Sequence, residues 1–126
     1  MTHHLRSVSG APAPVGPYSI AVEVNGLVFL SGQGAINPQG GGFADSIEDQ
    51  TRQTMENLRA ILGEYGLDFS HVVKASIFLI DMGDFAAMNG IYATYFDSDP
   101  PARTTVAVAA LPLPEMKIEI DMVAAR

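Results

Sequence analysis

The chain has 126 residues, of which 48% are hydrophobic and 17% charged, and it contains no cysteine. Its 7 basic and 14 acidic side chains give a formal net charge of -7. This composition predicts one compact domain over residues 1–126 and excludes disulfides, thiol nucleophiles and cysteine-ligated metal centres. An acidic chain with scattered basic residues is unsuited to nucleic acid. No secretory signal or membrane-spanning apolar run is visible, so we expect a cytoplasmic protein.

The first third of the chain is predicted to form strands around a tight turn. Asn25-Gly26 tolerates the positive φ angles of a type I′ hairpin turn and stands between two apolar segments. The proline-rich stretch 11–17 lacks several backbone donors and is expected to be a loop. Three strands are predicted here, over 5–9, 18–24 and 27–33.

Two amphipathic helices are predicted in the centre of the chain. The first is capped by Asp45 or Ser46, carries apolar residues at helical spacing and stops at Gly66. The second is capped by Asp84 and ends before Pro100. Its apolar stripe comprises Phe85, Met88, Ile91 and Tyr95.

The remaining strands precede and follow the second helix. β-branched and aromatic residues predict strands over 72–80, 104–110 and 117–124. The last of these alternates between apolar and charged residues, as a strand with one buried face does. Because each helix joins two strands, at least part of the sheet is expected to be parallel or mixed.

Two charged residues are candidates for a functional site. Arg103 enters an otherwise apolar strand, where a cation must find an anion because an unpaired buried charge is costly. Its planar fork suits a carboxylate held by two hydrogen bonds, and an internal salt bridge is the competing interpretation. Glu119 is aimed rigidly from the middle of a strand, but Lys117 and Asp121 share its face, so simple exposure to solvent is the alternative.

Other motifs predict little chemistry. The glycine-containing stretches 31–34 and 40–42 lack the spacing of a nucleotide-binding loop, and turn geometry explains both. His3 and His4 are expected in a frayed terminus, and His71 in a surface or capping role. This spacing of histidines predicts no metal site, and no serine lies in a nucleophile elbow.

Seven short stretches relate the chain to a known family. They are 13–19, 28–33, 50–58, 73–79, 81–89, 101–103 and 117–120. In this order they resemble the Rid family of reactive intermediate deaminases, also called the YjgF group, over nearly the full length. The resemblance implies a chorismate-mutase-like α+β fold, a mixed β-sheet with two helices packed on one face. It also implies a homotrimer with ligand clefts between adjacent subunits.

The same resemblance assigns roles to individual residues. Arg103 falls on the carboxylate-binding arginine, and Glu119 falls on the acidic residue that positions or activates water. Pocket-lining polar positions match Tyr18, Ser31 and Asn89, for which a role in the subunit interface is the alternative. Thr105, also expected to line the substrate pocket, replaces a cysteine common in archetypal members. The small residues Gly34 and Ala35 replace a bulkier pair common in the family and are a second departure. The resemblance therefore does not assign the side chain of the preferred substrate.

The implied reaction is hydrolysis of 2-aminoacrylate and its tautomer 2-iminopropanoate, or of 2-iminobutanoate, to a 2-oxo acid and ammonia. The partner is then a small imino or enamino acid, and no metal or organic cofactor is expected. Three alternatives are a deaminase of a related catabolic enamine, a non-catalytic ligand-binding or chaperone-like trimer, and an endoribonuclease. The acidic charge balance disfavours the endoribonuclease.

Overall fold

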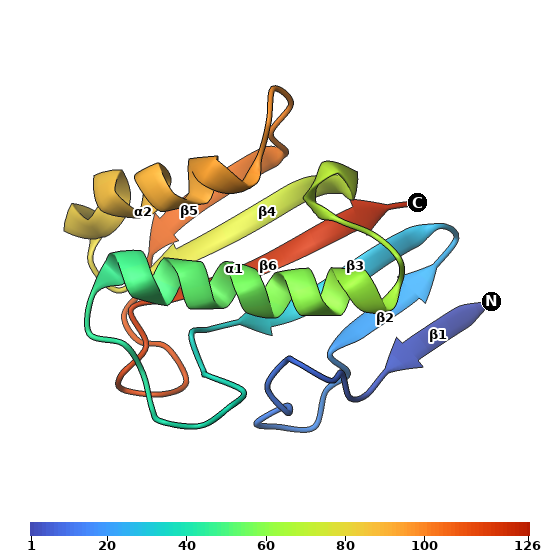
Figure 1. Cartoon of the computed structure of the whole chain (residues 1–126), viewed down its shortest axis with the longest axis horizontal. Coiled ribbons are helices and arrows are strands. Elements are labelled where there is room, and N and C mark those ends of the chain that lie inside the picture. Colours follow the sequence, from blue (N-terminus) through green and yellow to red (C-terminus); the bar gives the residue numbers. More distant parts are fainter.

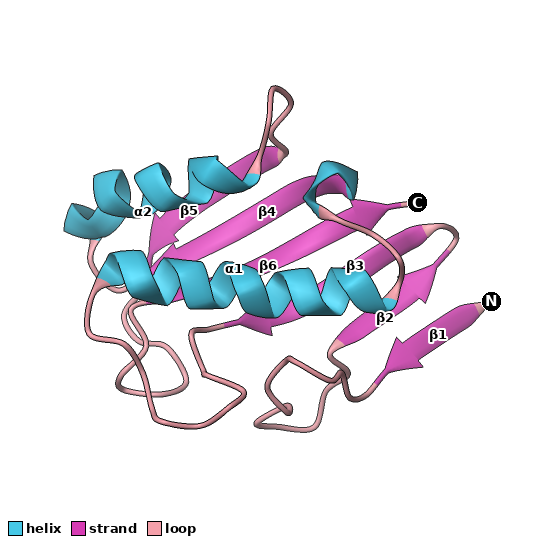
Figure 2. Ribbon diagram, in the orientation of Figure 1, coloured by secondary structure: helices cyan, strands magenta, loops and turns pink.

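The computed structural model describes residues 1–126 as a six-stranded sheet with two α-helices on one of its faces (Figures 1 and 2). The strands are β1 (Thr2–Leu5), β2 (Ala21–Val24), β3 (Leu27–Gln33), β4 (Val72–Leu79), β5 (Ala102–Ala107) and β6 (Ile118–Ala125). The helices are α1 (Ile47–Glu64) and α2 (Phe85–Tyr92), with short 3-10 turns η1 (Phe69–His71), η2 (Met82–Asp84) and η3 (Ala93–Tyr95).

The sheet is mixed, as the sequence predicts, with strand order β1-β2-β3-β6-β4-β5. β4 and β5 are parallel and are joined through α2, whereas every other neighbouring pair is antiparallel. α1 joins β3 to β4, and β6 lies between these two strands (Figure 1). The last strand of the chain is therefore a central one, which places Glu119 in the interior of the sheet rather than at an edge.

The turn between β2 and β3 confirms the predicted hairpin. Asn25 and Gly26 have φ angles of 53° and 78°, the left-handed conformation that a type I′ turn requires. β2 begins at Ala21, later than predicted, because the chain before it is still turning. The amide of Tyr18 donates to the carbonyl of Gly16 at 3.0 Å instead of entering the sheet.

The N-terminal strand differs from its prediction in position. β1 spans Thr2–Leu5 and pairs with β2, whereas the strand predicted over 5–9 is wrong because the chain leaves the sheet after Leu5. Gly10, with a φ of 87°, lies in the turn that follows. His3 and His4 therefore belong to an edge strand, which corrects the expected frayed terminus.

The boundaries of α1 agree with the predicted caps. Ser46 is the N-cap, and its hydroxyl oxygen accepts a hydrogen bond from the amide of Asp49 at 3.1 Å. Gly66 follows the helix with a φ of 70°. His71 has the expected capping role, because its Nδ1 accepts from the amide of Asp68 in the capping box of η1.

α2 starts directly after Asp84, as predicted, but its capping hydrogen bond and its buried face correct two predictions. Asp84 makes no capping hydrogen bond, because Asp81 caps the preceding turn η2 by accepting from the amide of Gly83. Within the predicted stripe only Met88 is buried, and Phe85 is 38% exposed. Tyr92, which the prediction left out, is 5% exposed, so the buried face of the helix is rotated toward it.

β5 begins and ends earlier than the predicted strand 104–110. It starts directly after Pro101, where Ala102 pairs with Lys74, and it ends at Ala107 because its partner strand β4 stops at Leu79. Arg103 consequently lies within the strand rather than just before it. Its side-chain direction is fixed by the alternation of β5.

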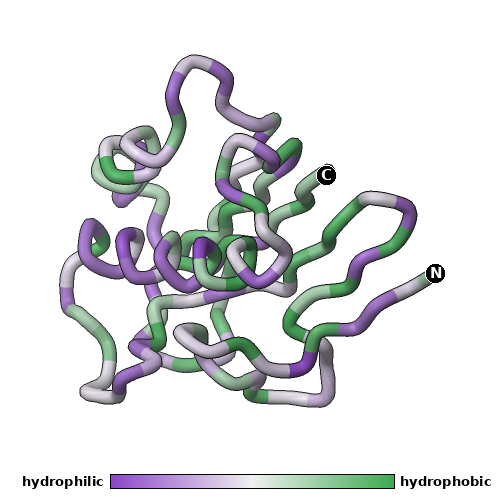
Figure 3. The backbone as a smooth tube through the Cα atoms, turned by 45° about the vertical axis from the view of Figure 1, so that its right-hand side comes forward, coloured by the Kyte–Doolittle hydropathy of each residue, from purple (hydrophilic) through white to green (hydrophobic).

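One face of the sheet forms the hydrophobic core with the helices, and the other is uncovered. Alternate residues of β6, including Ile118 and Ile120, are fully buried beneath α1 and α2. Hydrophobic stretches follow the central strands in Figure 3. Apolar side chains on the uncovered face are exposed, among them Phe29 at 43% and Val106 at 40%. No helix of the structure is long and apolar enough to span a membrane.

Candidate active site

Arg103 lies on the helix-covered face of β5. Its register partner on β4 is Ala75, which is fully buried beneath the helices. The guanidinium carbon lies over the ring of Tyr92 at 5.0 Å from the centroid and over the ring of Phe85 at 5.6 Å. No carboxylate oxygen lies within 4.0 Å of its nitrogens, so the chain itself contains no salt bridge to Arg103. Two aromatic faces hold the cation while its N–H donors stay available.

Unpaired polar atoms surround this arginine. A cavity of about 280 Å³ is lined by residues that include Asn89, Tyr92, Asp97 and Arg103. The buried atoms Asn89 Oδ1, Tyr92 Oη and Thr105 Oγ1 have no hydrogen-bond partner. Buried polar atoms are normally paired, so these three atoms offer hydrogen-bonding capacity that the chain itself does not use.

The hydroxyl of Tyr92, next to Arg103, stays protonated and uncharged. Burial of the phenol raises the pKa of Tyr92 to about 12, although the positive charge of Arg103 opposes the shift. A tyrosine hydroxyl is neutral at neutral pH even at its ordinary pKa, and the raised pKa keeps Tyr92 neutral at higher pH as well, so it does not compete as an anion for the guanidinium.

Glu119 lies on the opposite, uncovered face of the sheet. It pairs in register with Phe78, and its neighbours Ile118 and Ile120 face the helices. Partial burial raises the pKa of the Glu119 carboxyl, and the negative charge of Asp121 raises it further. A carboxyl with a raised pKa is better matched to proton transfer near neutral pH than an exposed one.

The backbone of β3 makes room for this carboxylate. The register between β3 and β6 shifts between Leu30 and Gln33, which marks a bulge. A Cβ atom at Gly32 would lie 2.8 Å from Cδ and Oε2 of Glu119. A side chain at position 32 would therefore displace the carboxylate of Glu119 from its present position.

A small cavity of about 40 Å³ adjoins Glu119. Tyr18 lines it and is 44% exposed, and the Tyr18 hydroxyl accepts from the amide of Val15 at 3.3 Å. Ser31 lies outside this cavity, in a wide surface hollow of about 700 Å³ that also contains Tyr18. The Ser31 hydroxyl donates to the carbonyl of Ser19 at 2.6 Å, so it ties β3 to the preceding loop.

The predicted site residues thus form two separate groups within one chain. Arg103, Asn89 and Thr105 gather near α2, whereas Glu119 and Tyr18 gather beyond β6. β4 lies between β5 and β6, and the register partners of Arg103 and Glu119 on β4 are three residues apart, about 10 Å along the strand. Since the two side chains also point to opposite faces of the sheet, one chain cannot place both on one small ligand.

Sequence reasoning missed four residues that shape these groups. Phe85 and Tyr92 flank Asn89 on one face of α2, and their spacing of seven residues was a usable signal. Gly32 and Met116 had no such signal, because their roles depend on contacts across strands.

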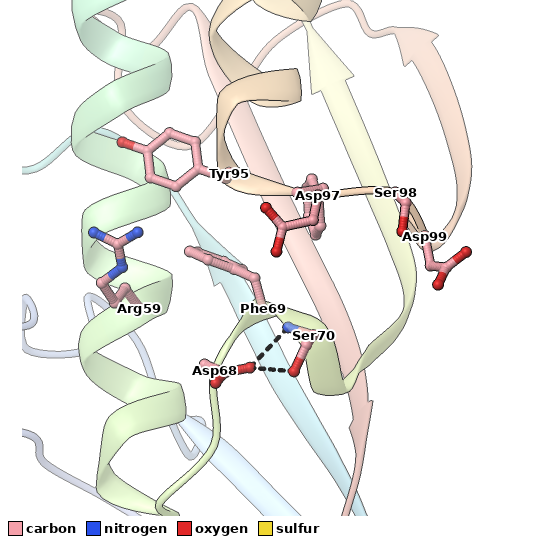
Figure 4. Close-up of a pocket in the computed structure, with 9 residues that line it drawn as sticks. Arg59, Asp68, Phe69, Ser70, Tyr95, Asp97, Ser98 and Asp99 are labelled. Carbon is pink, nitrogen blue, oxygen red and sulfur yellow. Dashed lines mark hydrogen bonds between the residues drawn. The ribbon is translucent and has the colours of Figure 1, made fainter.

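A separate hollow of about 500 Å³ lies between α1, η1 and the segment after η3 (Figure 4). Arg59 stacks there on Phe69 and Tyr95, and its charge is paired with Glu56 at 2.9 Å. Asp68 accepts hydrogen bonds from the amide and the hydroxyl of Ser70. The charged and polar groups of Arg59, Asp68 and Ser70 are thus paired locally, and no predicted site residue lines this hollow.

Comparison with known proteins places the chain in a family. The family model described as endoribonuclease L-PSP matches residues 8–126. Reactive Intermediate Deaminase A, chloroplastic, of Arabidopsis thaliana is 50% identical over 119 residues, which cover 94% of this chain and 63% of that protein. The 2-iminobutanoate/2-iminopropanoate deaminase of Mus musculus is 41% identical over 119 residues, covering 94% of this chain and 87% of that protein.

Solved structures agree with these relatives. The Yersinia pestis protein YyfA, described as a member of the conserved Rid protein family, superposes with a TM-score of 0.93 at 38% identity and full coverage of both chains. This similarity confirms the predicted chorismate-mutase-like α+β fold with a mixed sheet and two helices on one face. The chain therefore belongs to the Rid family, also called YjgF, whose model bears the description endoribonuclease L-PSP.

Proposed function

We propose that this protein is a deaminase that hydrolyses imines of small 2-amino acids. The reaction adds water across the C=N bond of R–C(=NH)–COO⁻ and releases ammonia, leaving the 2-oxo acid R–C(=O)–COO⁻. The names of the Arabidopsis and mouse relatives support this class of reaction. The enamine 2-aminoacrylate enters the same reaction after it tautomerises to 2-iminopropanoate.

The observation that carries the proposal is the unpaired guanidinium of Arg103. A cation held by two aromatic rings, with no carboxylate within 4.0 Å, is prepared to bind an anion from outside the chain. The substrate carboxylate supplies that anion. The orphaned hydroxyl of Thr105 can donate a hydrogen bond to the substrate, and the orphaned Oδ1 of Asn89 can accept one from the imine N–H.

Glu119 is the proposed acid–base group. Its carboxylate accepts a proton from the attacking water, and the resulting acid returns a proton to the departing amine. Burial supports this role because it raises the pKa of the carboxyl. General acid–base help of this kind contributes about 10²- to 10⁴-fold in rate. Tyr18 lies at the entrance of the same cavity and orients the ligand.

The separation of Arg103 from Glu119 supports an assembly with clefts between subunits, and we propose a homotrimer. The uncovered face of the sheet exposes apolar side chains, including Leu27, Phe29, Val73 and Val106. Apolar patches of this kind mark surfaces that another chain covers. Sedimentation equilibrium should give the mass of a trimer, and a monomer at micromolar concentration would refute the assembly.

A coupled assay tests the function. A serine or threonine dehydratase generates the imine, and its loss is followed with and without the protein. The parent should accelerate the loss, and Glu119→Gln should lower kcat with little change in KM, since it keeps the shape but removes the proton acceptor. A correctly assembled parent that leaves the spontaneous rate unchanged would refute the deaminase and favour the ligand-binding trimer.

The endoribonuclease alternative is disfavoured by the charge of the chain. The formal net charge is -7, although the family description carries that name. We also propose a single domain over residues 1–126, a reaction without cofactor and a cytoplasmic location, whereas the Arabidopsis relative is named as chloroplastic.

A further inference from the structure

The cavity beside Glu119 is lined by both polar and apolar side chains. The polar ones include Glu119, Gln33 and Tyr18, and the apolar ones include Ile36, Leu113 and Met116. A ligand whose reacting carbon lies at Glu119 would place an aliphatic substituent against these apolar side chains. The space left beside these apolar side chains depends on one contact between two residues that line the cavity.

That contact joins Met116 to Gly34. A Cβ atom at Gly34 would lie 2.4 Å from the Cε methyl of Met116 and 3.4 Å from its Sδ. Gly34 does not have a positive φ, so its backbone conformation does not require glycine. The methionine side chain, 6% exposed, occupies the space that a side chain at position 34 would fill.

Two buried amides of α1 fix both sides of this contact. Asn57 Nδ2 donates to the carbonyls of Gly34 at 3.0 Å and Ile36 at 2.9 Å. Gln50 Nε2 donates to the carbonyl of Glu115 at 2.9 Å, and Gln50 Oε1 accepts from the amide of Lys117 at 2.9 Å. The backbone on either side of Met116 is thus held, and only its side chain is free to adjust.

The remaining volume permits only a small substituent. The cavity measures about 40 Å³, whereas an apolar protein cavity that binds benzene measures about 150 Å³. In the part of the cleft that this chain forms, a methyl or ethyl group fits, and a branched or aromatic side chain requires Met116 to move.

We propose that Met116, seated against Gly34, determines substrate specificity by limiting the side chain of the imino acid to one or two carbon atoms. This inference rests on the proposed deaminase function and adds the substrate class to it. Met116 touches the substituent rather than the reacting atoms, so it governs which imine is used and not the chemistry itself.

The test compares two imines in the parent and in variants of both residues. A D-amino-acid oxidase generates the imines from D-alanine and D-leucine, and ammonia release above the spontaneous rate gives kcat/KM for each. The parent should prefer the alanine-derived imine. Met116→Ala should raise the leucine-to-alanine ratio of kcat/KM at least about tenfold, the effect of fitting one further methylene into an apolar pocket. This ratio does not depend on the fraction of active protein.

A second variant should act in the opposite direction. Gly34→Ala places a methyl group against Cε of Met116 and pushes the thioether into the cavity. The leucine-to-alanine ratio of kcat/KM should fall below that of the parent. This variant keeps the proposal testable if Met116→Ala does not fold. Met122→Ala is the matched control, because Met122 is 1% exposed in the helix-covered core and does not line the cavity. It should leave the ratio unchanged.

Each outcome bears on a different claim. A parental ratio in both Met116→Ala and Gly34→Ala would overturn the specificity role of Met116 and leave the deaminase function intact. A shift of the same size in Met122→Ala would also overturn it. Absence of turnover of either imine by the parent would overturn the proposed function, and this inference with it.

Discussion

Replacing Arg103 by alanine should separate ligand binding from folding. The guanidinium makes no ion pair inside its own chain, so the variant loses only packing and the two contacts with Phe85 and Tyr92. A cation–π contact at a partly exposed position is worth about 0.5–1 kcal/mol. We therefore expect the free energy of unfolding to fall by about 1–2 kcal/mol, a change that lowers Tm by several degrees and leaves the protein folded.

The loss in substrate binding should be larger. Truncating one partner of a hydrogen-bonded charge pair in a closed pocket costs about 2–5 kcal/mol. This energy corresponds to about 30- to 5,000-fold in kcat/KM, with a raised KM. Arg103→Lys should recover only part of the loss, because an ammonium group does not present the planar fork that binds a carboxylate with two hydrogen bonds.

The assay is the dehydratase-coupled loss of imine described above. Sedimentation and thermal unfolding must first show that both variants fold and assemble like the parent. If a correctly assembled Arg103→Ala protein retains the parental kcat/KM toward 2-iminopropanoate, the carboxylate anchor is refuted. Arg103 would then serve to pack α2 against β5, and the orphaned atoms around it would belong to a subunit interface.

Three further predictions follow from the two groups of site residues. Glu119→Gln should be more stable than the parent at pH 7, because a raised pKa means that ionising the native carboxyl costs stability. Denaturant titrations should show the difference vanishing below about pH 4, where both states of the parent are protonated, and an unchanged difference would contradict the assigned burial. Gly32→Ala should displace the flexible end of Glu119, so kcat should fall while Tm barely changes, and parental kcat would show that its position is not critical. Thr105→Ala removes a hydroxyl that has no partner, so kcat/KM should fall less than about tenfold, and a loss equal to that of Arg103→Ala would reveal a chemical role.

The parts of the fold that depend only on residues close in the chain were predictable from the sequence. Asn25-Gly26 and Gly66 act through their own backbone conformation, and Ser46 acts through a hydrogen bond to an amide three residues on, so all of them lie where the sequence predicts turns and helix ends. α2 starts directly after Asp84, as predicted, but the capping hydrogen bond was wrong, because Asp81 and not Asp84 accepts one, at the start of the preceding turn η2. The end of β5 was wrong because it depends on where β4 stops.

The candidate site was predictable in its residues but not in its arrangement. Arg103 and Glu119 are distinctive because charge is costly in apolar strands, and the resemblance to the Rid family gave them roles. Their separation onto opposite faces depends on register and on the insertion of β6 between β3 and β4, which no local pattern encodes. The contact between Gly34 and Met116 likewise joins segments far apart in the chain.

Complementation between two inactive variants tests whether each active site is shared between two subunits. If each site takes Arg103 from one subunit and Glu119 from its neighbour, Arg103→Ala and Glu119→Gln chains can restore one another. After subunits are exchanged by unfolding and refolding an equimolar mixture, about one quarter of the interfaces should combine an intact arginine with an intact glutamate. The mixture should then show about a quarter of the parental imine hydrolysis. Mixed assemblies verified by native mass spectrometry that show no more activity than the two variants alone would contradict a site shared between subunits.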